Sequence, residues 1–239
     1  TGQLTTTMVN MSRVSSIYAT DISQQFLQMT KKNIGVTTKP VFYYACDANH
    51  LPFVDNTFDL IVANSVLHHL LDYPLVLQQC LALLKPGGSV IFFEPVLQGK
   101  IMVAFLADLM LRIHRNTGHG TLTEQDCQKI ERMIKHISKS RTVGNNREKL
   151  AQMEDKYVFD IHELKALALQ SGFSEAFYRN NPAQDGRFRF NLHQHLCMAG
   201  IDEHKISEFR FLMNSAQEML IEMLPNDLYT PMGFFVFQK

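Results

Sequence analysis

The sequence has no excess of charge of either sign. Its 239 residues include 23 Lys and Arg and 23 Asp and Glu, so the formal net charge at pH 7 is zero. A basic surplus is what usually attracts nucleic acid or an anionic membrane surface. The sequence also lacks an Asn/Asp-Pro-Pro-aromatic motif that would receive a flipped base. We therefore expect no nucleic-acid partner and favour a small molecule as the substrate.

Long apolar runs are missing as well. A membrane-spanning helix needs about 20 consecutive apolar residues, and the longest candidate, residues 101–111, is too short and contains Asp108. The first residues do not show the basic and then apolar pattern of a secretory signal. We expect a soluble, cytoplasmic protein with no membrane span.

Cysteines are few and widely separated. Their spacing matches neither a zinc site nor a disulfide framework, so buried free thiols are the simpler interpretation. The four are Cys46, Cys80, Cys127 and Cys197. The histidines of segments 114–119 and 193–195 lack carboxylate or cysteine neighbours that would complete a metal site. The sequence therefore predicts no bound metal.

Residues 1–95 alternate between strand and helix patterns. The predicted strands are 16–19, 41–45, 58–63 and 89–93, and the predicted helices are 3–13, 23–33 and 73–84. The apolar run at 58–63 predicts a strand buried on both faces. Lys85-Pro86-Gly87-Gly88 ends the last helix, because proline cannot continue it and glycine adopts a positive φ. This order predicts an α/β fold with parallel strands.

The alternation stops after Pro95. Residues 97–156 are predicted to be mostly helical, with loops at 116–120 and 142–146. The later predictions are a helix from 160 or 161 to 170, a strand at 175–178, a helical region at 204–224 and a last strand at 234–237. The alternating segment from Arg187 to Phe190 is read as an edge segment over a pocket. We interpret residues 1–239 as one domain, in which insertions 97–156 and 186–228 form a lid over a substrate.

Acidic residues follow two successive predicted strands. Asp21 ends the strand near Ile17, and Asp47 ends the strand that begins at Val41. Ligands of open α/β sheets bind at this carboxyl edge. One carboxylate there can accept hydrogen bonds from both hydroxyls of a ribose, and another can accept a hydrogen bond from an adenine amino group. A single strand-end Asp is often only a turn or cap residue. Two in succession favour a nucleotide-like ligand.

A longer motif surrounds Asp47. The string D-x-x-x-LPF-x-D-x-x-FDLI-x-x-x-x-x-LHH-L, followed by LKPGG, resembles class I S-adenosylmethionine-dependent methyltransferases, particularly the broad group that contains quinone-biosynthesis enzymes. The resemblance covers about residues 1–95, with a weaker match at 161–178 and at the terminal FFVFQK. It implies a Rossmann-like, mostly parallel sheet flanked by helices, with S-adenosylmethionine as cofactor and S-adenosylhomocysteine as product. It does not indicate the methyl acceptor or the atom methylated.

The resemblance also implies roles for particular residues. Asp21 would bind the ribose, Ile22 would form an apolar wall on the adenine, and Asp47 with the Ala48 backbone would hold the adenine amino group. The methionine portion would lie beside Asn64, Ser65 and Val66, and Thr1-Gly2 would end the glycine turn. Leu51-Pro52-Phe53 and Lys85-Pro86-Gly87-Gly88 are interpreted as structural signatures rather than ligand contacts.

His68 and His69 follow the strand at 58–63, where this family places residues that face the methyl group. Either could act as a general base, because the pKa of histidine lies near the working pH. The other interpretation is that they cap the following helix. Positioning alone can supply much of the rate of methyl transfer, because the sulfonium is already activated.

The family's usual strand order, 3-2-1-4-5-7-6, places its first strand at the sheet centre, and that strand and its first glycines are absent here. The strands at Ile17 and Phe58 would then flank an empty slot. We expect the sequence to be a fragment, or a partner chain or another segment to fill the slot, or the protein to be a degenerate binding module. The alternative to an enzyme is thus a non-catalytic, methyltransferase-like subunit that scaffolds a partner. A homodimer or a partner subunit stays open.

Overall fold

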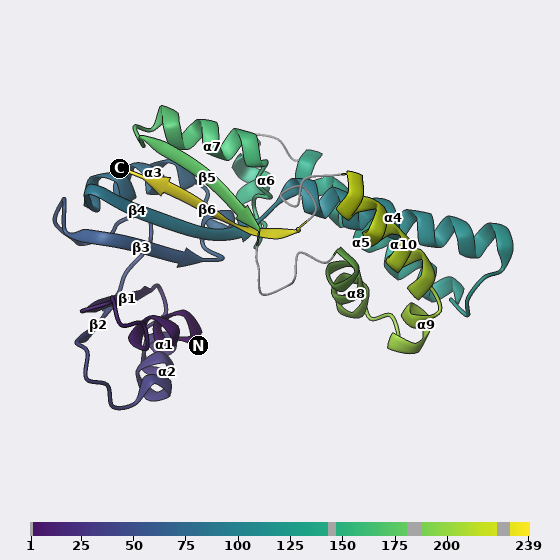
Figure 1. Cartoon of the computed structure of the whole chain (residues 1–239), viewed down its shortest axis with the longest axis horizontal. Helices are drawn as coiled ribbons and strands as arrows, with labels where there is room; N and C mark the ends of the chain where they lie inside the picture. The colour runs from purple at the N-terminus through teal and green to yellow at the C-terminus, as the bar shows by residue number, and fades with distance from the viewer. Residues whose placement is uncertain (1, 143–146, 181–187, 224–229) are drawn as a thin grey trace.

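The computed structural model describes residues 2–142, 147–180, 188–223 and 230–239, and their strands form two sheets (Figure 1). In the first sheet, β1 (Ile17–Asp21) runs parallel to β2 (Val41–Ala45), with Ile17 opposite Val41. The second has the order β3-β4-β6-β5. These strands are β3 (Phe58–Asn64), β4 (Leu84–Pro95), β5 (Glu175–Asn180) and β6 (Met232–Gln238). The β3 and β4 strands are parallel, whereas β6 is antiparallel to both of its neighbours.

The gap expected between the strands at Ile17 and Phe58 is present. No ladder of hydrogen bonds joins β1 to β3 in the part of the chain that the structure describes. Aromatic side chains connect the two sheets instead. The ring centroids of Tyr18 and Phe58 are 5.4 Å apart, and Phe53 packs edge-on against Phe58 at 5.1 Å. Phe53 therefore has the structural role that its motif predicted.

Two short helices accompany the first sheet. The first, α1 (Gln3–Val9), ends before residue 13 because it buries no side chain, so no packing extends its threonine-rich sequence. The second, α2 (Gln24–Ile34), begins as predicted, with Ser23 accepting a hydrogen bond from the Phe26 backbone. These helices hold the chain on either side of Asp21.

The second sheet has one well-covered face. Phe92, Phe235 and Phe237 are buried there in one cluster with Leu77 of α3 (Tyr73–Leu83) and Leu164 of α7 (Ile161–Gln170). Figure 1 places α3 and α7 beside this sheet. The prediction that residues 58–63 are buried on both faces is wrong, since Leu60 is 39% exposed. β3 is an edge strand of its sheet, so its apolar run is only partly covered.

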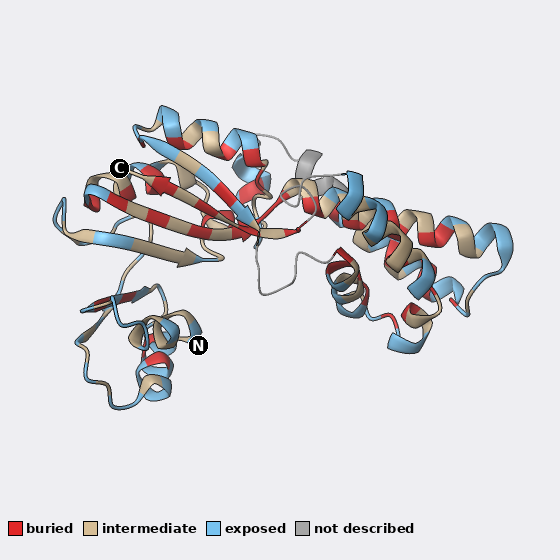
Figure 2. Cartoon of the chain, viewed as in Figure 1, coloured by how far each residue is buried: buried red, intermediate tan, exposed pale blue. Residues whose placement is uncertain are grey.

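The segments predicted as insertions build a second cluster of buried side chains, away from the sheets (Figure 2). Met110, Ile130, Phe188 and Phe209 are among its fully buried members. The helices concerned are α4 (Leu97–Thr117), α5 (Glu124–Thr142), α8 (Phe188–Met198), α9 (Glu203–Ser207) and α10 (Arg210–Met223), while the short α6 (Arg147–Ala151) precedes α7.

The prediction of an edge segment at 187–190 is wrong for residues 188–190, which the structure describes, because they form the first turn of α8. Phe188 is fully buried there, so its side chain serves the helical core rather than a sheet edge. Arg187 lies outside the described residues. Among the described helices, none combines the length and apolarity of a membrane span.

Candidate active site

A cavity of about 340 Å³ lies where α1, β1 and the end of β3 meet. Its walls include five residues for which the sequence predicted cofactor contacts, namely Gly2, Asp21, Ala48, Asn64 and Val66. They come from four separate segments of the chain, and the fold brings them to one place. The cavity runs along the gap between β1 and β3. Its walls include residues 19–21 of β1 and 61–64 of β3, so it reaches the carboxyl ends of both strands, which form the ligand-binding edge of an open α/β sheet.

Of the other predicted cofactor residues, the three that the structure describes do not line this cavity. Ile22 is 76% exposed. Asp47 is exposed and accepts hydrogen bonds from the backbone and side-chain nitrogens of Asn49, both at 2.9 Å. Ser65 has a positive φ of 56° and donates its backbone N–H to Phe93. Thr1 lies outside the described residues. Their contact with a cofactor stays a prediction.

Asp21 is both a turn residue and part of the cavity wall. One carboxylate oxygen, Oδ1, accepts the backbone N–H of Ser23 at 2.8 Å, which starts the turn into α2. The same residue lines the cavity. The turn therefore fixes the backbone while the carboxylate stays at the cavity wall.

Gly2 allows a close approach between α1 and α2. Its φ is 82°, and a Cβ atom at this position would lie 2.6 Å from Cγ2 of Thr30. Both Gly2 and Thr30 line the cavity. A larger residue here would push the wall apart, since neither the backbone conformation nor the space suits a side chain.

Glu94 is a fully buried carboxylate that the sequence analysis did not select. Its Oε1 accepts the backbone N–H groups of Val66 and Leu67, at 2.9 and 2.8 Å. Its Oε2 lies 2.6 Å from Nδ1 of His68. Glu94 thus holds the loop after β3, which carries Val66 to the cavity. The strand-end rule that selected Asp21 and Asp47 would also have found Glu94, because it ends the apolar run at 89–93.

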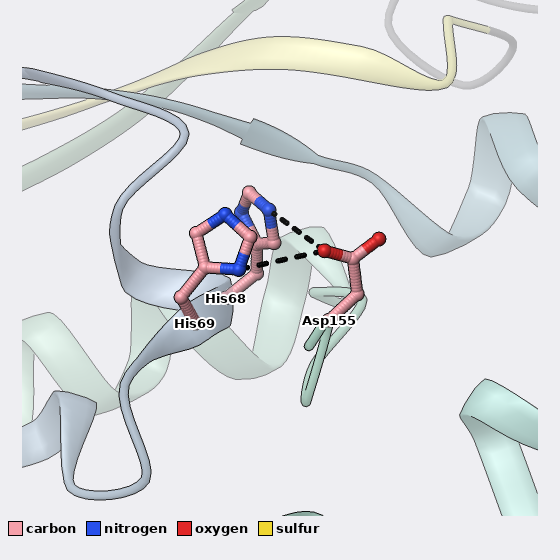
Figure 3. A group of neighbouring side chains, drawn as sticks. All are labelled: His68, His69 and Asp155. Carbon is pink, nitrogen blue, oxygen red and sulfur yellow. Dashed lines mark ion pairs between the residues drawn. The ribbon is translucent and has the colours of Figure 1, made fainter. Parts of the chain in front are cut away.

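The two histidines lie together with Asp155, as Figure 3 shows. Nε2 of His68 is 3.5 Å and Nδ1 of His69 is 3.4 Å from Oδ1 of Asp155. His68 is buried and His69 half-buried, and their ring centroids are 3.9 Å apart. No sequence signal pointed to Asp155, which is 86 residues beyond His69 in a segment without a motif.

The interpretation of the histidines as helix caps is wrong. They lie in a short 3₁₀ helix, Leu67–His69, and α3 begins only at Tyr73, after Asp72. His68 bonds to Glu94, and His69 Nδ1 is 3.0 Å from the carbonyl oxygen of Glu154. Asp72 accepts two hydrogen bonds from the Arg147 guanidinium in a bidentate ion pair. This contact lowers the pKa of Asp72 and connects α6 to the start of α3.

His68, His69 and Asp155 are also the kind of group that can hold a metal ion. His68 has a suitable free nitrogen, because its Nδ1 faces Glu94 and leaves Nε2 toward Asp155. The nitrogen of His69 that faces Asp155 is Nδ1, and it donates its hydrogen to the Glu154 carbonyl oxygen, so it has no lone pair for a metal. The arrangement therefore suits proton transfer better than metal binding. The absence of a metal, as predicted from the sequence, is not tested by these distances.

A thiol also borders the cavity. Cys80 is buried, and burial raises its pKa to about 12. It is therefore protonated at neutral pH and unsuited to act as a nucleophile. Among the described residues, the polar side chains in its walls are carboxylate, amide, hydroxyl and thiol groups, and neither His68 nor His69 lines it.

Comparison with known proteins supports the methyltransferase resemblance and the α/β fold. Residues 1–92 match a family model described as a methyltransferase domain. The solved structure of an S-adenosylmethionine-dependent methyltransferase from Mesorhizobium loti has a TM-score of 0.51 and 12% sequence identity. That match covers 95% of this chain and 81% of the other. The resemblance to class I S-adenosylmethionine-dependent methyltransferases, and the α/β fold it implied, are confirmed.

Two curated relatives match about a third of the chain at higher sequence identity. The arginine-hydroxylase NDUFAF5 of Rattus norvegicus is 39% identical over 80 residues, which are 34% of this chain and 22% of the relative. The ubiquinone/menaquinone biosynthesis C-methyltransferase UbiE of Haemophilus ducreyi is 31% identical over 87 residues, 35% of this chain and 33% of the relative. The chain thus matches a third or less of the length of these relatives.

Proposed function

We propose that this protein transfers a methyl group from S-adenosylmethionine to a small-molecule acceptor at oxygen, nitrogen or carbon. The observation that carries the proposal is the cavity at the ends of β1 and β3, which gathers Gly2, Asp21, Ala48, Asn64 and Val66 from four segments. Its volume of about 340 Å³ is within the range of small-molecule and cofactor sites. The match of residues 1–92 to a methyltransferase domain supports the same cofactor.

The residues at the walls suit the parts of such a cofactor. The Asp21 carboxylate accepts hydrogen bonds from ribose hydroxyls, and the Asn64 amide offers both a donor and an acceptor to the charged methionine end. Apolar walls, among them Leu4, Leu51 and Ile61, exclude water between these polar points. When bound, the cofactor supplies a methyl group on a positively charged sulfur, which needs no further activation.

His68 is the general base in this proposal. Its Nδ1–H donates to Glu94, so the lone pair of Nε2 is directed away from the buried carboxylate and can accept a proton from an acceptor hydroxyl or amine. Glu94 stabilises the imidazolium that forms. His69 positions Asp155 and contacts no buried carboxylate itself. A carbon acceptor would use the same base to remove the proton that methylation displaces.

Calorimetric titration with S-adenosylhomocysteine tests the proposal. We expect binding to the wild-type protein, and a loss of affinity of at least about tenfold for Asp21→Asn, because a charged acceptor is removed. The substitution keeps an oxygen for the Ser23 backbone and so preserves the turn. Asp55→Asn, an exposed turn residue outside the cavity, is the matched control and should bind like wild type. No measurable heat with the wild-type protein would exclude the proposed cofactor.

A second candidate is a protein that does not methylate. The relative with 39% identity over 80 residues is named an arginine-hydroxylase, so a segment similar to part of this chain also occurs in a protein with another named activity. A non-catalytic subunit that scaffolds a partner belongs to the same class of alternatives. Release of S-adenosylhomocysteine from S-adenosylmethionine in the presence of candidate acceptors separates the two. Cofactor binding without turnover on any acceptor, together with stable capture of a protein partner, would favour the second candidate.

A further inference from the structure

The helical region contains a larger cavity, of about 600 Å³, between α4, α5 and α8. Basic side chains are concentrated in its walls. Lys100 comes from α4, Lys129 and Arg132 from α5, and His195 from α8, whereas Asp155 is the only carboxylate among the described residues of the lining. Because the chain as a whole has no net charge, this local surplus reflects placement by the fold rather than composition.

Lys100 is the most informative of these residues. Its Nζ lies 3.1 Å from Nε2 of His195, and Nδ1 of the same ring is 2.7 Å from the Asn191 carbonyl oxygen. Nδ1 therefore carries the proton, and Nε2 accepts a hydrogen bond from the lysine. Burial and the charge of Lys100 lower the pKa of His195, which keeps the ring neutral.

The charge on Lys100 has little compensation. Burial lowers the pKa of its ammonium, and the nearby Asp155 only partly opposes this effect. Within the described residues, no carboxylate lies within 4 Å of its Nζ, whereas Lys129 contacts both the Gly200 carbonyl at 2.8 Å and Asp126 at 3.9 Å. A half-buried cation without an ion-pair partner is costly unless a ligand supplies the negative charge.

One residue of this cavity also lies beside the proposed base. Asp155 lines the cavity, and its carboxylate lies 3.5 Å from Nε2 of His68. His68 is two residues beyond Val66, which lines the cofactor cavity. A molecule held by Lys100 and reaching past Asp155 would approach the proposed base.

We propose that this cavity binds the anionic end, a carboxylate or a phosphate, of the methyl acceptor. Lys100 is the main contact, and Arg132 adds a second cation from α5. The Nε of Arg132 donates a hydrogen bond to the Gln128 carbonyl oxygen in the same helix. The acceptor's reactive group then faces His68. This inference rests on the proposed function, since it assigns the class of methyl acceptor for the same site. It implies that neutral analogues of the acceptor bind poorly.

The test uses three probes of similar size: phenyl phosphate, benzoate and the neutral benzyl alcohol. Calorimetry of the whole protein should show binding of at least one anionic probe and none of the alcohol. Tighter binding of phenyl phosphate identifies a phosphate-bearing acceptor, and tighter binding of benzoate a carboxylate-bearing one. Equal binding of the alcohol, or no binding of either anion, overturns the inference.

Variants locate the binding. We expect Lys100→Gln to lower the affinity for the anionic probe by about tenfold or more. Lys100→Arg should retain most of the affinity, because the positive charge is kept. Lys32→Gln, an exposed residue of α2, is the matched control. If Lys100→Gln does not fold, the exposed Arg132→Gln replaces it and should weaken binding in the same direction. Unchanged affinity in a folded Lys100→Gln protein overturns the inference.

Titration with S-adenosylhomocysteine separates this inference from the proposed function. Lys100→Gln should bind it as wild type does, because Lys100 does not line the cofactor cavity. If the wild-type protein binds S-adenosylhomocysteine but no anionic probe, only the inference on the acceptor fails. If it binds the anion but not S-adenosylhomocysteine, the proposed function fails while the anion site stands.

Discussion

Nδ1 of His68 lies 2.6 Å from Oε2 of Glu94, and both side chains are buried. The other oxygen of Glu94 accepts two backbone N–H groups from the loop after β3. One carboxylate at the end of β4 therefore fixes both the path of the loop that lines the cofactor cavity and the orientation of the proposed base. This makes Glu94 a positioning residue for the whole site.

Removal of Glu94 should lower stability more than removal of an ordinary surface carboxylate. We expect Glu94→Ala to reduce the free energy of unfolding by about 3–5 kcal/mol, because it leaves buried donors without an acceptor. Glu94→Gln keeps one oxygen for the loop and should cost less. Urea denaturation followed by circular dichroism measures both. Glu131→Gln, which breaks only an exposed contact to Arg115, is the control and should leave the unfolding midpoint almost unchanged.

The tautomer of His68 can be measured directly. We expect nitrogen-15 NMR of the wild-type protein to show a proton on Nδ1 of His68, because that atom faces the carboxylate of Glu94. In Glu94→Gln this preference should weaken, whereas the signals of His114, whose Nδ1 faces the His119 carbonyl oxygen, should not change. A His68 ring protonated only on Nε2 in the wild type would contradict the proposed direction of proton transfer.

The outcome for individual residues shows what a sequence can reveal about such a site. Asp21 was selected because strand ends can be recognised locally, and the family resemblance indicated Asn64 and Val66; all three line the cavity. Asp155 and Lys100 were not found, since only tertiary packing brings them beside residues far away in the chain. The burial of β3 was overestimated for a related reason: an apolar run does not tell whether a neighbouring strand covers it.

Acid should destabilise the helical region through Asp126. Burial alone would raise the pKa of this carboxyl, but hydrogen bonds from Lys205 and from the Thr123 backbone and hydroxyl lower it to about 2, from a usual value of 3.8. A lowered pKa means that the ionised form of Asp126 stabilises the fold. This stabilisation is complete above pH 3.8 and disappears as the pH falls toward 2.

The corresponding variant is Asp126→Asn. At neutral pH it should lose about 2 kcal/mol of unfolding free energy, as a shift of this size implies. The difference from wild type should shrink as the pH is lowered from 4 toward 2. Thermal denaturation at several pH values measures it. Asp108→Asn, which breaks a half-exposed contact to Arg112 one helical turn away, should have only a small effect. A pH-independent deficit would contradict the linkage.

Gly99 should tolerate no side chain. It is buried in the first turn of α4, and a Cβ atom there would lie 2.1 Å from the carbonyl carbon and oxygen of Thr230. Thr230 is itself buried and lies two residues before β6, so the obstacle is backbone that cannot move aside alone. We expect Gly99→Ala to destabilise the protein by about 1–3 kcal/mol through overpacking. The loss should appear in the unfolding midpoint.

Gly87→Ala provides the contrast. Its φ of 76° also disfavours a side chain, but no atom lies within 4 Å of the added Cβ. It should cost only about 1–2 kcal/mol of backbone strain, without displacing its neighbours. Because α4 also carries Lys100, displacement of its first turn in Gly99→Ala should weaken the binding of an anionic probe, whereas Gly87→Ala should not. Equal probe affinity in the two variants would show that α4 keeps its place despite the collision.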